Sequence, residues 1–251
     1  SGYETGDPNT PPLPVRPYAT EVGAKVEKLR VGLLSGALLP GGLDHPDARA
    51  SVEATGKLLQ SLGHHVEVAH PAALNEAEFG DVFLAIVIAH IANDVAALEK
   101  AFGVTLTTDD IEPGNHLLAQ FGNATTAVAY LSAVSWVHAW TRRVVSWWLP
   151  RDGKQGFDVL VTPTLAGPPP KIGALSGDDS TDRIREIMQY TAQFNMTGQP
   201  AISLPLHTSA SGLPMGVQFV GAPYREDLLI RLAAQIEAAA PWSSRRPAVH
   251  A

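Results

Sequence analysis

Cysteine is absent from this chain of 251 residues. The absence excludes disulfides, zinc sites built on thiolates and catalysis by a cysteine nucleophile. An excess of positive charge is lacking too, because 18 Lys and Arg residues stand against 25 Asp and Glu, for a formal net charge of −7. A surface that neutralises phosphates needs basic residues, so we expect no nucleic-acid partner.

Long apolar runs are also missing. The longest covers residues 82–89, far short of the roughly 20 residues that cross a bilayer. No charged-then-apolar secretory signal stands at the start. We therefore expect no membrane association and, by default, a cytoplasmic location. The chain opens at Ser1 on a segment typical of a connector, so we expect it to begin within a longer protein.

Several catalytic motifs do not occur. The sequence has no Gly-x-Ser-x-Gly nucleophile elbow, no glycine spacing of a phosphate-binding loop and no His-Glu-x-x-His. These absences argue against an alpha/beta hydrolase, a nucleotide-binding protein and a zinc protease. His64, His65 and His70 cluster at a turn without paired carboxylates, and we interpret them as solvated turn histidines. We expect neither a metal nor a cofactor.

What is present indicates one folded α/β unit. Five of the first 20 residues are prolines. Proline resists both helix and central strand, so we expect residues 1–20 to form an extended lead-in. In the remainder, 21–251, a short apolar run at 29–34 is followed by a helical pattern at 46–62 and an alternating strand at 65–68. Such a strand, helix, strand unit pairs its strands in parallel.

The middle third is expected to form a helical layer at about 76–150. Residues 76–102 and 125–148 contain no proline and predict two long helices, while Pro113 and Gly114 would break or kink any helix between them. Four tryptophans lie along the second helix, and packing is the favoured interpretation over ligand stacking. They are Trp136, Trp140, Trp147 and Trp148. His90 and Asn93 could line a pocket, although edge hydrogen bonds are favoured.

The last third returns to strands. Short apolar runs at 159–161, 202–204 and 217–220 predict three of them, with helices at 182–194 and 226–237. The alternation favours a single mixed α/β domain. Gly212-Leu213-Pro214 predicts a tight turn between the second and third of these strands.

A possible ligand site lies where the strand at 159–161 ends. Pro163 stops the strand, and the prolines at 168–170 stiffen the loop that follows. Ligands of open α/β sheets bind beyond the carboxyl ends of strands. Thr162, Thr164 and Leu165 therefore occupy the position of a substrate wall, while a merely rigid loop is an equal alternative.

Three motifs together resemble the carboxy-terminal half of the amidase signature family, the Ser-cisSer-Lys hydrolases. They are Phe157-Asp158-Val159-Leu160-Val161-Thr162-Pro163-Thr164, Phe194-Asn195-Met196-Thr197-Gly198-Gln199-Pro200-Ala201-Ile202-Ser203-Leu204-Pro205 and Gly212-Leu213-Pro214-Met215-Gly216-Val217-Gln218. The resemblance implies part of the amidase signature fold, a mixed β-sheet covered by helices. It also implies hydrolysis of a carboxamide C–N bond in a small linear or cyclic amide.

The family's lysine and its glycine- and serine-rich nucleophile segment are not found in this sequence. Ser176 and Ser211 lack that surrounding composition, so no catalytic residue is assigned in the chain. The resemblance instead implies a substrate-binding role for a set of residues on the acyl side of the pocket: Thr162, Thr164, Leu165, Ile172, Phe194 and Asn195.

We therefore expect a carboxy-terminal amidase fragment that is inactive alone and needs an amino-terminal catalytic half. A small-molecule amide is the expected substrate, and a homodimer would cover the sheet edge and apolar face that half a sheet exposes. Two alternatives stay open: a non-catalytic binding or regulatory module, and a subunit completed by a separate catalytic chain.

Overall fold

One mixed five-stranded sheet organises the molecule. A computed structural model describes residues 4–7, 10–38, 42–150, 153, 155–175 and 180–246. The strand order is β2-β1-β3-β5-β4. The strands are β1 (Arg30–Leu33), β2 (His65–Val68), β3 (Val159–Pro163), β4 (Ala201–Thr208) and β5 (Pro214–Gly221).

The first three strands are parallel. Val31 of β1 pairs with Val66 of β2 on one side and with Val159 of β3 on the other. Helix α1 (Pro46–Ser61) connects β1 to β2, as a crossover must when two parallel strands are adjacent. Pro46 at the start of α1 and Gly63 with φ of 93° just after its end explain the helix limits. The predicted strand, helix, strand unit is confirmed.

Strand β5 runs opposite to the other four strands. β5 pairs antiparallel with both β3 and β4, and the β4–β5 hairpin turns at Gly212, whose φ is 84°. Glycine adopts this left-handed backbone without steric cost. The tight pair predicted from the sequence is confirmed, and β4 forms one edge of the sheet.

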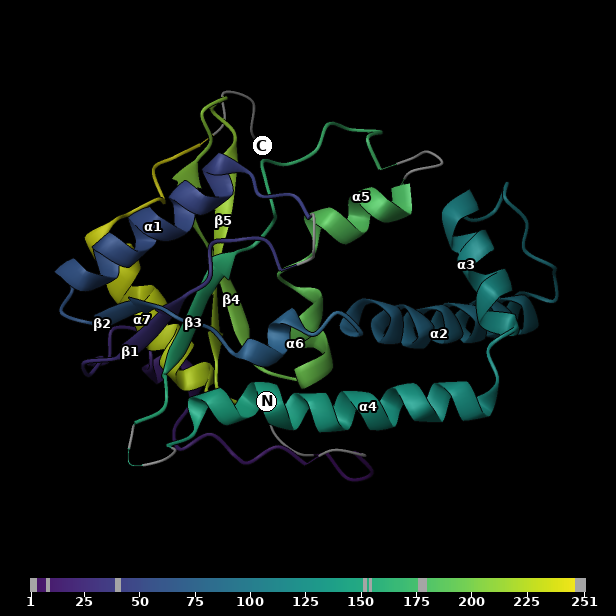
Figure 1. Cartoon of the computed structure of the whole chain (residues 1–251), viewed down its shortest axis with the longest axis horizontal. Helices are drawn as coiled ribbons and strands as arrows, with labels where there is room; N and C mark the ends of the chain where they lie inside the picture. Colours follow the sequence, from purple (N-terminus) through teal and green to yellow (C-terminus); the bar gives the residue numbers. More distant parts are fainter. Residues whose placement is uncertain are drawn as a thin grey trace.

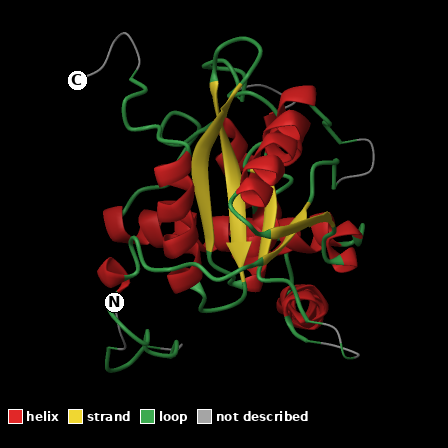
Figure 2. Cartoon of the chain, turned by 90° about the vertical axis from the view of Figure 1, so that its left-hand side faces the viewer, coloured by secondary structure: helices red, strands yellow, loops and turns green. Residues whose placement is uncertain are grey.

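Helices cover both faces of the sheet (Figure 2). Helices α1 and α7 (Glu226–Ala239) pack on the face of Val31, Val161 and Phe219, where their buried side chains form one apolar cluster. The opposite face, with Leu160 and Val220, is covered by α4 (Ala127–Val145) and α6 (Ala192–Thr197). Burial of these two clusters is the main source of stability.

Three helices extend beyond the sheet. Helices α2 (Phe79–Phe102), α3 (Pro113–Asn123) and α4 form a layer to one side (Figure 1). A Cβ at Gly122 would lie 2.0 Å from the carbonyl oxygen of Ile88, so glycine is needed where α3 meets α2. The prediction that Pro113 breaks or kinks a helix is wrong. Pro113 occupies the first turn of α3, where its missing N–H costs nothing.

Helix α2 is unusually apolar. By length and mean hydropathy, 1.8 over its most apolar stretch, it could cross a membrane, and 11% of that stretch is buried. Its contacts with α3 and α4 place it in the helical layer. One such helix is weak evidence for a membrane protein, and the absence of a membrane partner stays a prediction.

The tryptophans of the helical layer are packing residues, which confirms the favoured interpretation. Trp140 of α4 is fully buried, and its ring stacks on Phe79 with centroids 4.7 Å apart. Trp136 stacks on Trp140 at 5.9 Å. Trp147, in the 3-10 turn Ser146–Trp148, stacks on Phe157 at 3.8 Å.

The prediction of one helix at 182–194 is wrong, because the segment forms two helices. Helix α5 (Ser180–Ile187) ends where the N–H of Ala166 donates to the carbonyl of Ile187 at 3.1 Å. In a continuous helix the N–H of Thr191 would donate to the carbonyl of Ile187. Here it donates to the carbonyl of Met188 instead. A tertiary hydrogen bond from the loop after β3 therefore ends α5 and lets α6 begin separately.

The interpretation of His64 as a solvated histidine is also wrong. His64 is buried, and its Nδ1 accepts from the N–H of Leu29 at 3.2 Å. Its Nε2 is 2.9 Å from Oε1 of Gln235 on α7, which requires the Nε2–H tautomer. His64 thus ties the segment after α1 to α7 as a buried core residue.

The lead-in is anchored to α7 by a buried carboxylate. Glu21 accepts two hydrogen bonds of 2.6 Å from the Arg16 guanidinium and lies 3.1 Å from Arg231 of α7. The hydrogen bonds from Arg16 lower the pKa of Glu21, and the nearby charges of Arg16 and Arg231 add to this effect. The boundary of the lead-in at residue 20 stays a prediction.

We expect Glu21→Gln to lower the free energy of unfolding at pH 7. A carboxylate with a depressed folded-state pKa adds stability that is present above its unfolded-state pKa of about 4.3 and disappears as pH falls through the folded-state pKa. The difference between variant and wild type should therefore shrink in acid. Urea unfolding from pH 7 to pH 3 measures it, with the exposed Glu53→Gln as control. A pH-independent difference would contradict this role.

Candidate functional site

The carboxyl end of β3 brings polar side chains from three strands into one row. Thr162 of β3 is the register partner of Gln218 on β5, and Gln218 is the partner of Ser203 on β4. Residues two apart on a strand share a face, so Gly216 and Gln218 lie on the same side of β5. The polar row, defined as Thr162, Thr164, Ser203, Gly216 and Gln218, crosses the sheet beside α6.

Side-chain hydrogen bonds hold the buried part of the polar row in place. Gln218, 5% exposed, donates from Nε2 to Oγ1 of Thr162 at 3.0 Å and to the carbonyl of Tyr190 at 2.8 Å. Thr162 has no exposed surface, and its hydroxyl donates to the carbonyl of Pro163 at 2.8 Å. These bonds fix the end of β3 against the segment that leads into α6.

Tyr190 extends this connection to the loop after β1. Its hydroxyl donates to the carbonyl of Gly36 at 3.1 Å. Burial raises the pKa of Tyr190 to about 12, with a smaller contribution from the charge of Asp44. The hydroxyl therefore stays protonated at neutral pH and holds the loop after β1 near the polar row.

The accessible part of the polar row is a pair of hydroxyls. Oγ1 of Thr164 lies 2.6 Å from Oγ of Ser203, and the N–H of Thr164 donates to the carbonyl of Gly216 at 3.1 Å. A Cβ at Gly216 would lie 2.4 Å from the Ser203 oxygen and 2.8 Å from the Thr164 oxygen. Glycine at this position leaves room for the two hydroxyls to meet.

Gly216→Ala should separate the hydroxyl pair and destabilise the chain by about 1–3 kcal/mol, the usual cost of overpacking. In a Ser203→Ala background the cost should shrink, because the oxygen that the new methyl meets is gone. Urea unfolding measures both. Gly114→Ala is the control, since no atom lies within 4 Å of that position, and it should leave stability equal or slightly raised. Wild-type stability in Gly216→Ala would refute the close contact.

The remaining predicted substrate residues lie in different environments. Leu165 is half-buried next to Thr164, and Ile172 is fully exposed on the loop after β3. Phe194 of α6 is buried in the same apolar cluster as Trp140, whereas the next residue, Asn195, is exposed. Only Thr162 and Thr164 are thus brought together in the polar row. The substrate-binding role of all six residues stays a prediction.

Three members of the polar row were missed by the sequence reasoning: Ser203, Gly216 and Gln218. All three lie inside the motifs quoted for the family resemblance. The period of two along the strand at 217–220, extended backwards to Gly216, could have placed Gly216 and Gln218 on one face. The pairing with Thr162 and Ser203 depends on strand register, which no local pattern supplied.

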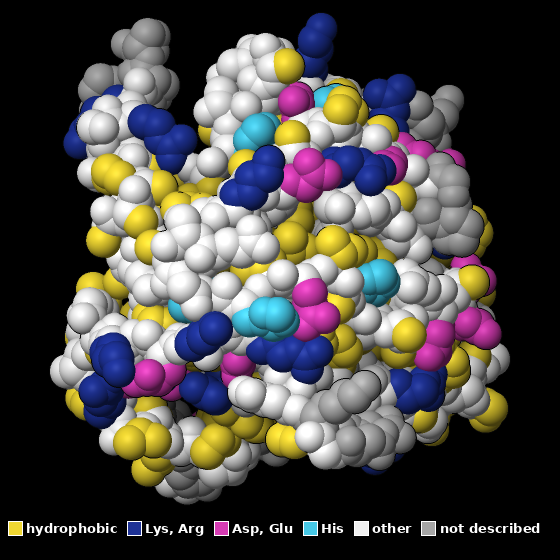
Figure 3. Space-filling view, turned by 60° about the vertical axis from the view of Figure 1, so that its left-hand side comes forward, with side chains coloured by type: hydrophobic (Ala, Val, Ile, Leu, Met, Phe, Trp, Pro, Cys, Tyr) yellow, Lys and Arg dark blue, Asp and Glu magenta, His cyan; other side chains and the backbone are white. Residues whose placement is uncertain are grey.

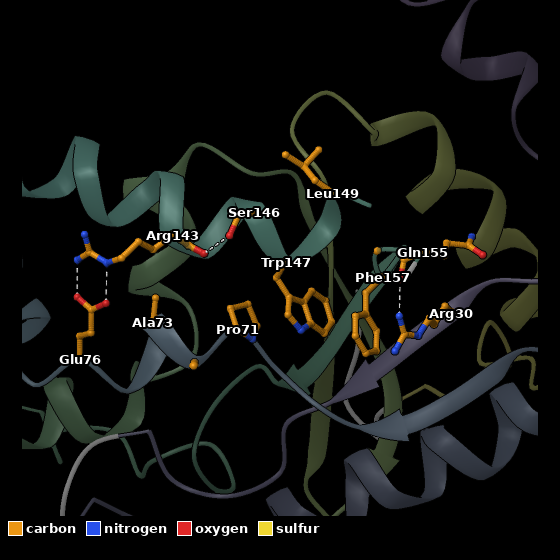
Figure 4. Close-up of a pocket in the computed structure, with 12 residues that line it drawn as sticks. Arg30, Pro71, Ala73, Glu76, Arg143, Ser146, Trp147, Leu149, Gln155 and Phe157 are labelled. Carbon is orange, nitrogen blue, oxygen red and sulfur yellow. Dashed lines mark hydrogen bonds and ion pairs between the residues drawn. The ribbon is translucent and has the colours of Figure 1, made fainter. Parts of the chain in front are cut away.

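A larger cavity lies elsewhere, between the end of α4 and the loop after β2 (Figure 4). It measures about 690 Å³, and its charged side chains are already paired. Arg143 binds Glu76 through hydrogen bonds of 2.8 and 2.5 Å, and Arg30 lies 3.9 Å over the ring of Phe157. Arg30 also forms an ion pair with Glu67 at 2.9 Å. Since all three charged side chains of the lining already have partners, we interpret this cavity as a gap between packed layers.

The weaker candidates His90 and Asn93 do line a pocket. They share an open hollow of about 620 Å³ with Tyr130, whose hydroxyl is 3.1 Å from Nε2 of His90. Its lining comes from α2, α3, α4 and the turn between α3 and α4, whereas the polar row lies on the sheet. The hydrogen bond to Tyr130 is the edge contact that the sequence favoured for His90.

The described part of the chain holds no assembled nucleophile. Ser211 lies in the hairpin turn with its hydroxyl 2.9 Å from that of Ser209, and Ser176 lies outside the described residues. No hydrogen bond joins a lysine to a serine within the described ranges, and there no three His, Asp or Glu side chains come together as metal ligands would. The polar row can contact a substrate but does not supply the activated serine of covalent catalysis.

The surface carries mixed charge. On the face in Figure 3, Lys and Arg side chains are interspersed with Asp and Glu, and no continuous basic area forms. This distribution fits the net charge of −7; the absence of a nucleic-acid partner stays a prediction.

Comparison with known proteins gives the same family from sequence and from structure. The chain is 34% identical over 257 aligned residues to the 6-aminohexanoate-cyclic-dimer hydrolase of Pseudomonas sp. (strain NK87), covering 98% of the chain and 51% of the relative. A putative amidase, AmiB2 of Mycobacterium tuberculosis, is 34% identical over 207 residues, covering 80% of the chain and 41% of the relative. The chain thus spans about half the length of these relatives.

The solved structures agree. The structure of 6-aminohexanoate cyclic dimer hydrolase complexed with substrate has a TM-score of 0.89 at 34% identity, covering 98% of this chain and 52% of that one. A bacterial aryl acylamidase has the same fold, with a TM-score of 0.75 at 19% identity, covering 96% of this chain and 49% of that one. The model of the Amidase family matches residues 1–230. On this match over most of its length, the chain belongs to the Amidase family.

Proposed function

We propose that this chain is the carboxy-terminal half of an amidase that hydrolyses the C–N bond of a small linear or cyclic carboxamide. The observation that carries the proposal is the likeness over 98% of the chain to half of a hydrolase of a cyclic amide. The serine nucleophile and the groups that activate it belong to an upstream half.

In this proposal the two halves divide the reaction. The upstream serine attacks the carbonyl carbon, the C–N bond breaks, and the amine leaves with a proton; water then cleaves the acyl ester and frees the serine. Backbone N–H groups near the serine stabilise the oxyanion. The present chain positions the substrate, and correct positioning of reacting atoms is itself a large part of catalysis.

The polar row provides the wall of the acyl pocket. Thr164 and Ser203 offer hydroxyls to polar groups of the substrate, while Thr162 and Gln218 hold the wall rigid from below. In this proposal Leu165, Ile172 and Asn195 also contact the substrate, and the buried Phe194 supports Asn195 from the core. The half-exposed hydroxyl pair and the hydrogen-bonded layer beneath it support these roles.

The surface that the upstream half covers in this proposal consists of the sheet edge at β4 and of exposed apolar side chains in neighbouring segments. Strand β4 is an edge with unpaired backbone groups, which invites further strand pairing. Large apolar side chains in the neighbouring segments are more than a third exposed: Leu43, Ile172, Leu175, Ile184, Met188 and Leu213. We propose that the upstream half covers them in the cytoplasm and that the isolated chain dimerises instead.

A serine-reactive fluorophosphonate tests the proposal. In a longer form that includes the sequence upstream of Ser1, the reagent should label one serine, and peptide mapping should place it upstream. The 251-residue chain alone should stay unlabelled at the same dose. Stoichiometric labelling of Ser203, Ser211 or any other serine of this chain would overturn the division between the halves.

A further inference from the structure

A small cavity lies where the lead-in meets the start of α7. It measures about 260 Å³ and lies between the segment before the 3-10 turn Tyr18–Thr20 and the turn that joins β5 to α7. Its lining consists of two tyrosines, one carboxylate and a short apolar segment rich in proline: Tyr18, Tyr224, Glu226 and residues 11–14. We call it the tyrosine cavity.

Tyr224 stands at a position that normally takes glycine. The N–H of Arg225 donates to the carbonyl of Ala222 at 3.2 Å and closes a turn. Pro223 is second in this turn, and Tyr224, with φ of 62°, is third. This is the pattern of a type II turn, in which glycine or asparagine avoids the steric cost of a positive φ.

Core packing does not offset the strain at Tyr224, because the residue is 57% exposed. The same exposure lets a solute reach its side chain. A bulky side chain that is kept in a strained backbone conformation at the surface points to a function for the ring.

Glu226 is a carboxylate beside the tyrosines without a cationic partner. Arginines of the lead-in and of α7 bind Glu21 and Asp227 instead, and Glu226 forms no ion pair with any described residue. It accepts a hydrogen bond from the hydroxyl of Tyr18 at 3.4 Å. Burial raises the pKa of Tyr18, and the charge of Glu226 adds to this effect, so the hydroxyl stays protonated as the donor.

These features define a ligand class. Tyrosine rings attract cations to their faces, and the carboxylate adds a full negative charge at short range. A primary ammonium has three N–H donors that need acceptors, whereas a quaternary ammonium has none and presents methyl groups to the apolar segment at 11–14. We infer that the tyrosine cavity binds the quaternary ammonium group of a small solute.

The tyrosine cavity lies apart from the polar row. Strand β5 ends at Gly221, whose register partner is Val159 at the start of β3. The turn from β5 to α7 is therefore at the opposite end of β3 from Thr164. Binding at this cavity is separate from the proposed amide hydrolysis and does not depend on it.

Choline and its neutral isostere 3,3-dimethylbutan-1-ol test the inference, because they share a shape and differ in charge. Titration of the 251-residue chain at constant ionic strength, followed through the ring NMR signals of Tyr18 and Tyr224, gives both dissociation constants. Choline should bind roughly tenfold more tightly than the alcohol. Glu226→Gln should remove most of this difference, whereas Glu53→Gln, on the exposed side of α1, should leave it unchanged.

Tyr224→Gly separates binding from folding. Glycine adopts a positive φ without strain, so the urea unfolding midpoint should stay equal or rise. Choline binding, followed through the ring signals of Tyr18, should nevertheless weaken roughly tenfold. Tyr224→Phe retains the ring and should bind choline as the wild type does.

Three results would each overturn the inference: no saturable choline shift, equal binding of choline and the alcohol, or wild-type choline binding in Tyr224→Gly. Phosphatidylcholine vesicles distinguish a lipid headgroup from a free solute. We expect the chain to stay in the supernatant when such vesicles are sedimented. Sedimentation that requires Tyr224, without binding of free choline, would overturn the assignment to a small solute.

Discussion

Trp140→Ala is expected to lower the free energy of unfolding by about 3–5 kcal/mol, the range for removing a large aromatic side chain from a core. Trp140 is fully buried where α4, α2 and the turn before α2 meet. Its indole N–H donates to the carbonyl of Ala73 at 2.8 Å, and its ring stacks between Phe79 and Trp136. Alanine would leave a cavity and an unpaired buried carbonyl.

Trp140→Phe separates these two contributions. Phenylalanine retains most of the ring contacts but cannot donate to Ala73, so its cost should stay near the 1–3 kcal/mol of an unsatisfied acceptor. Urea unfolding followed by circular dichroism measures both variants. A loss below about 1 kcal/mol in Trp140→Ala would show that this residue does not hold α4 to α2 and to the turn before α2.

Gln218→Leu is the second large expected effect, a loss of about 2–4 kcal/mol. Leucine has a similar volume, so packing changes little, but two hydrogen bonds disappear from the buried layer of the polar row. The carbonyl of Tyr190 and the hydroxyl oxygen of Thr162 both lose their donor, and each unsatisfied buried group costs about 1–3 kcal/mol.

Gln60→Leu serves as the matched control, because Gln60 is exposed on α1 and its replacement should change stability by less than about 0.5 kcal/mol. Equal unfolding midpoints for Gln218→Leu and Gln60→Leu would contradict the role of Gln218. A stable Gln218→Leu chain would also remove the support for Thr162 and Gln218 as the rigid base of the acyl wall.

Elements governed by local pattern were predictable from the sequence. The apolar run before α1, the helical period of α1 and the Gly212 turn each fix a backbone choice within a few residues, and the structure confirms all three. Elements governed by tertiary bonds were not. The end of α5 depends on a hydrogen bond from Ala166, and the burial of His64 depends on Gln235, 171 residues further along the chain.

The site shows the same division. Thr162 and Thr164 could be placed at the end of a strand because Pro163 marks that end in the sequence. Gln218 and Ser203 could not, since their positions depend on the register of β5 against β3 and β4.

The central claim is that this chain contributes binding surface and an upstream half contributes the nucleophile. Steady-state hydrolysis of hexanamide, followed by release of ammonia, tests it most directly in two proteins: the 251-residue chain and the longer form with the sequence upstream of Ser1. We expect turnover in the longer form that a serine-reactive inhibitor abolishes, and none in the short chain. Inhibitor-sensitive turnover by the short chain alone would contradict it.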